Sequence, residues 1–142
     1  ALVIHCPELK EGEAIPFSAV ERVRPLADRA EFLLFHTGWG RYWGTERYFG
    51  GYPCIDQGIV DYLLQSGKKG VGLDTIGVDP IADAYLSIHR RLFQDHDLVV
   101  MENLANLDQI GDGLFTLFAL PLRYQDADGS PIRAVAVLDG EE

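Results

Sequence analysis

The segment SIHRRLFQDHDLVVMEN, residues 87–103, predicts a short helix that runs into a buried strand. The helix is expected to extend over residues 84–94. The strand over 98–103 is a continuous apolar run, which is typical of strands buried on both faces of a sheet. Each element carries one polar residue where a core residue would fit: His89 in the helix and Glu102 at the end of the strand.

The alternation of helix and strand continues on both sides of this segment. Short apolar runs predict further strands, and amphipathic stretches predict the helices between them. The expected strands lie at residues 1–6, 31–37, 69–74, 98–103, 114–122 and 132–138, and the expected helices at 18–23, 56–67 and 84–94. This order predicts an α/β fold with mixed sheets and flanking helices, in a single domain over residues 1–142.

Two local signals mark where elements begin and turn. Ser18 followed by Glu21 fits a capping box that would begin the first helix, and Pro25 would break or restart that helix. Asp128-Gly129 predicts a hairpin turn between the last two strands, which would therefore be antiparallel.

Composition excludes several classes of partner. The formal net charge of −10 over 142 residues repels phosphate backbones, so nucleic acid is not expected as a partner. No apolar run is long enough to span a membrane, and no signal peptide is visible ahead of the first strand. Cys6 and Cys54 lack metal-ligand spacing and are expected to be buried free thiols in a cytoplasmic protein.

His89 and Glu102 are the first candidate site. A lone histidine on the packed side of a helix usually has a structural role, but a carboxylate at the end of a buried strand needs a partner. Strand ends in α/β folds are also where sites tend to lie. An imidazole and a carboxylate are natural ligands of Zn²⁺ or Mn²⁺. The alternative is a His–Glu hydrogen bond without a metal, and the spacing leaves both open.

An aromatic loop and two aspartates are the other candidates. Residues 38–53 hold six aromatic side chains between glycines, which could wall a ligand pocket, form a subunit interface or make a small satellite core. Asp74 and Asp79 follow a predicted strand. Such carboxylates could bind a metal, cap a helix or hold a loop through backbone N–H groups, and we favour the loop-holding role.

The chain resembles a known family in five ordered stretches. They are FHTGWGRYWG (35–44), GVGLDTIGVDP (70–80), IHRRLF (88–93), VVMENLANLDQI (99–110) and LFALPLRYQDADGSPIRAVAVLD (117–139). Together they resemble the cyclase family of metal-dependent hydrolases, which includes bacterial kynurenine formamidase and isatin hydrolase. The resemblance covers nearly the whole chain.

The resemblance implies a swivelling β/β/α fold, often in a dimer or larger homo-oligomer. It implies a divalent metal, Zn²⁺ or Mn²⁺, and hydrolysis of a small amide or lactam. In the family a histidine on a helix and a glutamate at the next strand are metal ligands, and these match His89 and Glu102. Trp39 would stack on the substrate.

One departure from the family bears on activity. The signature His-x-Gly-Thr-His-x-Asp, which supplies most metal ligands and the proton-transferring histidine, lies upstream of all five stretches and is absent from this chain. His36 stands where members carry a basic residue before Thr-Gly, and His5 stands where an aspartate is common. Gly77 replaces the serine of many members. The chain thus resembles the C-terminal part of the family fold with half of the metal site.

Three hypotheses follow for the function. In the first, the chain is part of a metal-dependent amide hydrolase whose remaining ligands come from upstream residues or another chain. In the second, it is a shortened, catalytically inactive relative that serves as a binding or oligomerisation module. In the third, it is a truncated reading frame that folds only by self-association through uncovered strand edges.

Overall fold

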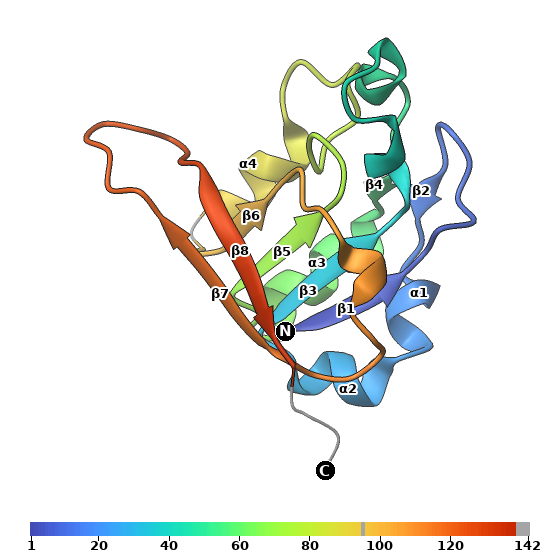
Figure 1. Ribbon diagram of the computed structural model, residues 1–142, viewed down its shortest axis with the longest axis vertical. Coiled ribbons are helices and arrows are strands. Elements are labelled where there is room, and N and C mark those ends of the chain that lie inside the picture. The colour runs from blue at the N-terminus through green and yellow to red at the C-terminus, as the bar shows by residue number, and fades with distance from the viewer. Residues whose placement is uncertain (95, 139–142) are drawn as a thin grey trace.

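A four-stranded parallel sheet forms the centre of the computed structural model, which describes residues 1–94 and 96–138 (Figure 1). Asp95 and residues 139–142 lie outside the described residues. The strands are β1 (Leu2–His5), β3 (Phe32–His36), β5 (Gly70–Leu73) and β6 (Val99–Met101), in the order β1-β3-β5-β6. Each neighbouring pair is parallel, so all four carboxyl ends lie at one edge of the sheet.

Two glycines of β5 let the sheet pack closely. A Cβ added at Gly70 would lie 2.5 Å from the backbone oxygen of Val99 in β6. One added at Gly72 would lie 2.6 Å from a methyl group of Leu104. The Gly-x-Gly of this strand is therefore required by packing, as is typical where another backbone approaches closely.

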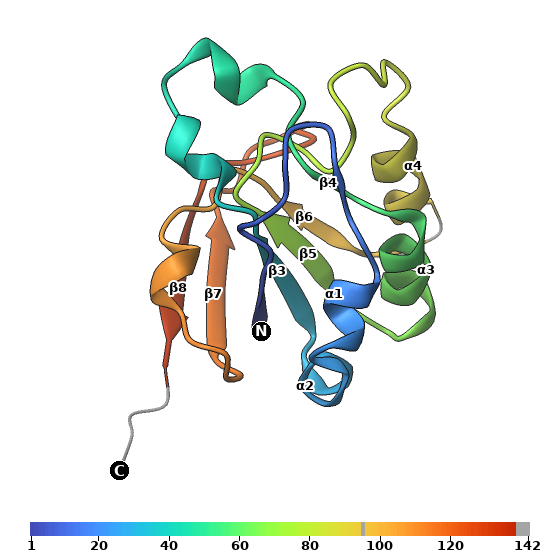
Figure 2. The ribbon, with the colours of Figure 1, turned by 90° about the vertical axis from the view of Figure 1, so that its right-hand side faces the viewer.

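Four helices cover one face of the sheet, and a hairpin covers the other (Figure 2). The helices are α1 (Ser18–Glu21), α2 (Arg24–Arg29), α3 (Gln57–Gln65) and α4 (Ser87–Phe93). Side chains of a strand alternate between the faces. Leu2 and Ile4 accordingly pack in the cluster that contains the helices, while Val3 packs in the cluster beneath the hairpin.

The hairpin joins β7 (Thr116–Pro121) to β8 (Ile132–Val137) in antiparallel register. Its inner face, including Leu117 and Ala134, packs on the sheet. Its opposite face carries apolar side chains that are about half exposed or more. We call this set the hairpin outer face, and it consists of Phe118, Leu120, Val135 and Val137. A two-stranded sheet with one face uncovered is marginally stable by itself.

Short elements complete the chain. Three turns of 3₁₀ helix lie in the loops, namely η1 (Trp39–Tyr42), η2 (Glu46–Phe49) and η3 (Leu107–Gln109). The two-residue strands β2 (Ala14–Ile15) and β4 (Cys54–Ile55), which the sequence analysis did not predict, pair in parallel. None of the helices in residues 1–94 and 96–138 is both long and apolar enough to cross a membrane.

A buried lysine fixes the carboxyl end of α2. Lys68 is 7% exposed, and its ammonium donates to the backbone oxygens of Ala27 at 2.6 Å, Ala30 at 2.7 Å and Asp28 at 3.2 Å. The last carbonyl groups of a helix lack partners within the helix. Lys68 satisfies them, and its positive charge favours the negative end of the helix dipole.

The predicted α/β class is confirmed, as are all six predicted strands within a few residues of their ends. The capping box was wrong, because Phe17 already has helical backbone angles and the Ser18 side chain makes no cap. The predicted antiparallel pairing of the last two strands is confirmed, but Gly129 lacks the positive φ that a tight Asp-Gly hairpin turn requires. That residues 1–142 form one domain stays a prediction.

Candidate metal and ligand site

The carboxyl edge of the parallel sheet gathers most of the polar side chains that the sequence singled out. His5 ends β1, His36 ends β3, Asp74 follows β5, and Glu102 follows β6. In open α/β sheets, ligands bind in the crevice outside this edge. We therefore expect a ligand site at this edge of the sheet.

His89 lies between two carboxylates. Its Nδ1 is 2.5 Å from Oδ2 of Asp79, and its Nε2 is 3.1 Å from Oε1 of Glu102. Asp79 is 2% exposed and also accepts the backbone N–H groups of Ile88 and His89, at 2.5 and 3.0 Å. Asp79 therefore caps the beginning of α4 and holds the imidazole ring, so these contacts show helix capping where the sequence analysis favoured loop holding.

The His89–Glu102 pair has the donor types of a metal site. Zn–N and Zn–O bonds of about 2 Å allow two donors about 3 Å apart to contact one ion. The Asp79 carboxylate behind Nδ1 is the arrangement that commonly orients a metal-binding histidine, because it leaves Nε2 for the ion. Among the residues that the structure describes, no group of three or more His, Cys, Asp or Glu side chains is placed to hold a metal. These residues thus supply two ligands.

The two carboxylates also change the acidity of the imidazole. The hydrogen bond to Glu102 raises the pKa of His89, burial opposes this rise, and the hydrogen bond to Asp79 adds to it. A histidine whose pKa is raised on folding stabilises the fold fully below its ordinary pKa of about 6.5, and this stabilisation is lost as pH rises through the raised pKa.

Replacing Glu102 with glutamine is expected to lower the pKa of His89 in the metal-free protein, because Glu102 makes the largest favourable contribution. NMR titration of the His89 ring in the presence of a chelator measures this shift. Glu46→Gln, which changes an exposed carboxylate on η2, is the matched control and should leave the titration unchanged. An unchanged His89 pKa in Glu102→Gln would show that the contact between His89 Nε2 and Glu102 does not form in solution.

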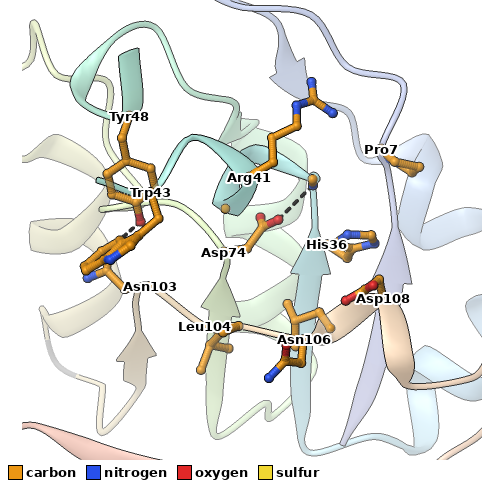
Figure 3. A pocket seen from close by; sticks show the side chains of 14 residues that line it. Pro7, His36, Arg41, Trp43, Tyr48, Asp74, Asn103, Leu104, Asn106 and Asp108 are labelled. Carbon is orange, nitrogen blue, oxygen red and sulfur yellow. Dashed lines mark hydrogen bonds between the residues drawn. The ribbon is translucent and has the colours of Figure 1, made fainter. Parts of the chain in front are cut away.

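A pocket of about 600 Å³ is lined in part by Asn103, the residue that follows Glu102 (Figure 3). Arg41, Trp43 and Tyr48 of the aromatic loop line it, together with His36 and the segment 103–108. The Tyr48 hydroxyl donates to Oδ1 of Asn103 at 2.5 Å, and Asn103 follows Glu102 directly. Burial raises the pKa of Tyr48 to about 12, so its hydroxyl stays a donor at neutral pH. This contact joins the aromatic loop to the segment that follows Glu102.

Asp74 holds the loop that carries these side chains. It is 4% exposed, and its Oδ1 accepts the Thr37 N–H at 3.0 Å and the Thr37 hydroxyl at 2.6 Å. Its Oδ2 accepts the N–H of Gly38 at 2.7 Å. Gly38 has φ +74°, which a glycine adopts without strain. The predicted loop-holding role of Asp74 matches these contacts.

Side chains of the aromatic loop, residues 38–53, take two of the three expected roles. Trp39, Tyr48, Tyr52 and Cys54 form a buried satellite cluster, while Trp43 is 67% exposed and lines the pocket. Trp39 is 2% exposed, and its indole N–H donates to the backbone oxygen of Tyr48 at 3.0 Å. The structure thus buries Trp39 in the satellite cluster, while Trp43 lines the pocket. The sequence analysis missed Trp43 because a loop without periodicity does not show which aromatic faces outward.

Comparison with known proteins gives one family. Residues 3–80 match the family model described as "Putative cyclase". A kynurenine formamidase of Bacillus cereus is 42% identical over 126 residues, which cover 89% of this chain and 54% of that protein. One of Bacillus anthracis is 42% identical over 83 residues, which cover 58% of this chain and 39% of that protein. The chain therefore spans about half the length, or less, of these curated relatives.

Solved structures agree on the fold. An isatin hydrolase bound to the product analogue thioisatinate superposes with a TM-score of 0.81 at 23% identity, over 96% of this chain and 58% of that one. A structure described as a predicted metal-dependent hydrolase from Bacillus stearothermophilus superposes with a TM-score of 0.74 at 20% identity, over 96% and 62%. At these identities the likeness establishes the fold alone.

Proposed function

Because the chain belongs to the cyclase family, we propose that it supplies His89 and Glu102 to a divalent-metal site that hydrolyses a small amide or lactam. The observation that carries the proposal is the contact of 3.1 Å between His89 Nε2 and Glu102 Oε1, with Asp79 fixed behind the ring. A histidine with a purely structural role does not require a second carboxylate, on Nε2, in addition to the carboxylate of Asp79 on Nδ1.

The substrate class rests on the relatives. Kynurenine formamidase and isatin hydrolase are the names of proteins that match in sequence and in fold, respectively. By its name the first acts on a formamide, and the second on isatin. The donor set of one imidazole and one carboxylate suits Zn²⁺ or Mn²⁺.

A bound divalent ion would polarise a carbonyl group and lower the pKa of a bound water. The residues of this chain would hold the metal ion and orient its ligands and the substrate. Asp79 keeps a proton on Nδ1 of His89, which leaves Nε2 as a ligand, and Glu102 adds a negatively charged oxygen. Trp43 offers an aromatic face to a planar substrate in the pocket, and Trp39 supports that loop from behind.

The site would be completed from outside the described residues. Catalytic zinc sites have about three protein ligands, and the residues that the structure describes offer two, His89 and Glu102. Since the match covers 54% of the Bacillus cereus relative, the missing ligands would come from upstream residues or from a second chain. We include in the proposal a homo-oligomer that covers the hairpin outer face, and a cytoplasmic location.

Metal binding tests the proposal independently of turnover. The purified chain is expected to bind Zn²⁺ or Mn²⁺ after chelation and dialysis, with an affinity at least about tenfold lower in His89→Phe and in Glu102→Gln, as for the loss of a ligand or its partner. Metal content by mass spectrometry and isothermal titration measure it. His96→Phe, which removes an exposed histidine just beyond α4, is the matched control. Equal affinity in all four proteins would contradict the proposal. Hydrolysis of an N-formyl aromatic amide is the second readout.

A second candidate is a binding or oligomerisation module without catalysis. It is favoured by the hairpin outer face, where Leu120 is 72% exposed and Val137 50% exposed. Contiguous apolar surface of this kind marks an interaction site. A chain that forms a defined oligomer but retains no metal would support this function over the first.

A further inference from the structure

Two histidines on neighbouring strands share a hydrogen bond at the carboxyl edge of the sheet. His5 ends β1 and His36 ends β3, and the register of the two strands places them side by side. Their Nδ1 atoms are 3.0 Å apart. Since a hydrogen bond needs one donor and one acceptor, one of these nitrogens carries a proton and the other does not.

The contacts of Nε2 of His5 show which of the two Nδ1 atoms carries the proton. His5 Nε2 lies 3.1 Å from the backbone oxygen of Ile110, and 4.0 Å from a carboxylate oxygen of Asp112. A carbonyl oxygen and a carboxylate only accept, so Nε2 of His5 carries the proton. In the neutral ring Nδ1 of His5 is then bare, and it accepts the proton on Nδ1 of His36.

These successive contacts therefore fix the tautomer of His36. With its proton on Nδ1, the neutral His36 ring has a bare Nε2. Among the residues that the structure describes, no hydrogen-bond partner of this Nε2 is recorded. His36 lines the pocket of about 600 Å³, so Nε2 is the ring atom left for a molecule in that pocket (Figure 3).

We propose that His36 is a ligand-binding residue whose Nε2 accepts a hydrogen bond from an N–H or O–H group of a planar ligand in the pocket, with His5 as its positioning residue. The exposed indole of Trp43 lines the same pocket and offers the face on which such a ligand stacks. This role lies outside the metal site, because it involves neither His89 nor Glu102. It holds whether or not the chain hydrolyses an amide.

The tautomers are the first test. Long-range ¹H–¹⁵N NMR of the metal-free protein, at about pH 8.5 where an ordinary imidazole is neutral, should show the proton of His36 on Nδ1 and that of His5 on Nε2. In His5→Phe the acceptor is gone, and His36 should move towards the Nε2–H form. His96→Phe is the control and should change neither ring. A proton on Nε2 of His36 in the unmodified chain would overturn the proposal, and this result needs no variant to fold.

Ligand recognition is the second test. Phenol and its methyl ether anisole are matched planar probes that differ in one donor. Phenol is expected to bind about fivefold more tightly, as for one net neutral hydrogen bond, with shifts of the Trp43 indole signal in NMR. The preference should fall to about one in His36→Phe and in His5→Phe. Equal binding of the two probes to the unmodified chain, or a preference that survives in both variants, would overturn the proposal.

Discussion

Replacing Lys68 with methionine is expected to lower the free energy of unfolding by about 3 kcal/mol, because buried carbonyl groups without a donor cost about 1–3 kcal/mol each. Methionine keeps most of the aliphatic stem and removes the ammonium. The oxygens of Ala27 and Ala30, which Lys68 contacts at 2.6 and 2.7 Å, then lose their donor at the end of α2. Burial lowers the pKa of Lys68, and the charge of Asp28 opposes this shift. The measured loss of stability is therefore the cost of the lost hydrogen bonds minus the cost of burying the ammonium group.

The neighbouring lysine is the matched control. Lys69 pairs with Glu31 on the surface, where both side chains are 62% exposed. Exposed ion pairs contribute little to stability, so Lys69→Met should unfold close to the unmodified chain. Urea unfolding of the three proteins measures the difference. If both variants unfold alike, the contacts of Lys68 do not stabilise α2.

Replacing Asp74 with alanine is expected to lower the free energy of unfolding by about 3 kcal/mol as well, since it leaves buried N–H groups without an acceptor. The donors are the backbone N–H groups of Thr37 and Gly38 and the Thr37 hydroxyl. For a domain of this size the melting temperature should fall by roughly 10 °C. The loop that begins at Gly38 should also loosen, and with it the pocket wall around Trp43.

Calorimetry measures the first effect, and fluorescence quenching of tryptophan by iodide measures the second. Asp108→Ala is the control for Asp74→Ala, because Asp108 lines the same pocket but is exposed. It should change neither readout. A variant at Asp74 that melts like the unmodified chain would show that water replaces the carboxylate without loss.

Much of the sheet could be predicted from the sequence because its signal is local. Residues 31–37 and 69–74 are apolar runs of strand length, and burial on both faces requires such runs. His89 and Glu102 could be singled out because each interrupts an apolar element. The structure brings these two side chains into contact, which neither run shows by itself.

Other features depend on contacts between distant segments. The beginning of α1 is set by Asp56, whose carboxylate accepts the Phe17 N–H at 2.8 Å, so the local capping signal at Ser18 does not decide it. The same carboxylate caps α3 through Ile59. The His5–His36 contact depends on the register of β1 against β3, which no short stretch of sequence encodes.

The all-parallel sheet also has a consequence for how quickly the chain reaches its structure. Each pair among β1, β3, β5 and β6 joins residues about 30 to 40 positions apart, so the entropy of closing long loops comes before any sheet hydrogen bond forms. The β7–β8 hairpin closes a much shorter loop and can form earlier. During folding the inner face of the hairpin then stays exposed to solvent until the sheet on which it packs has formed. This interval is when self-association competes most strongly with folding, so slow sheet assembly limits the yield of refolding at high protein concentration.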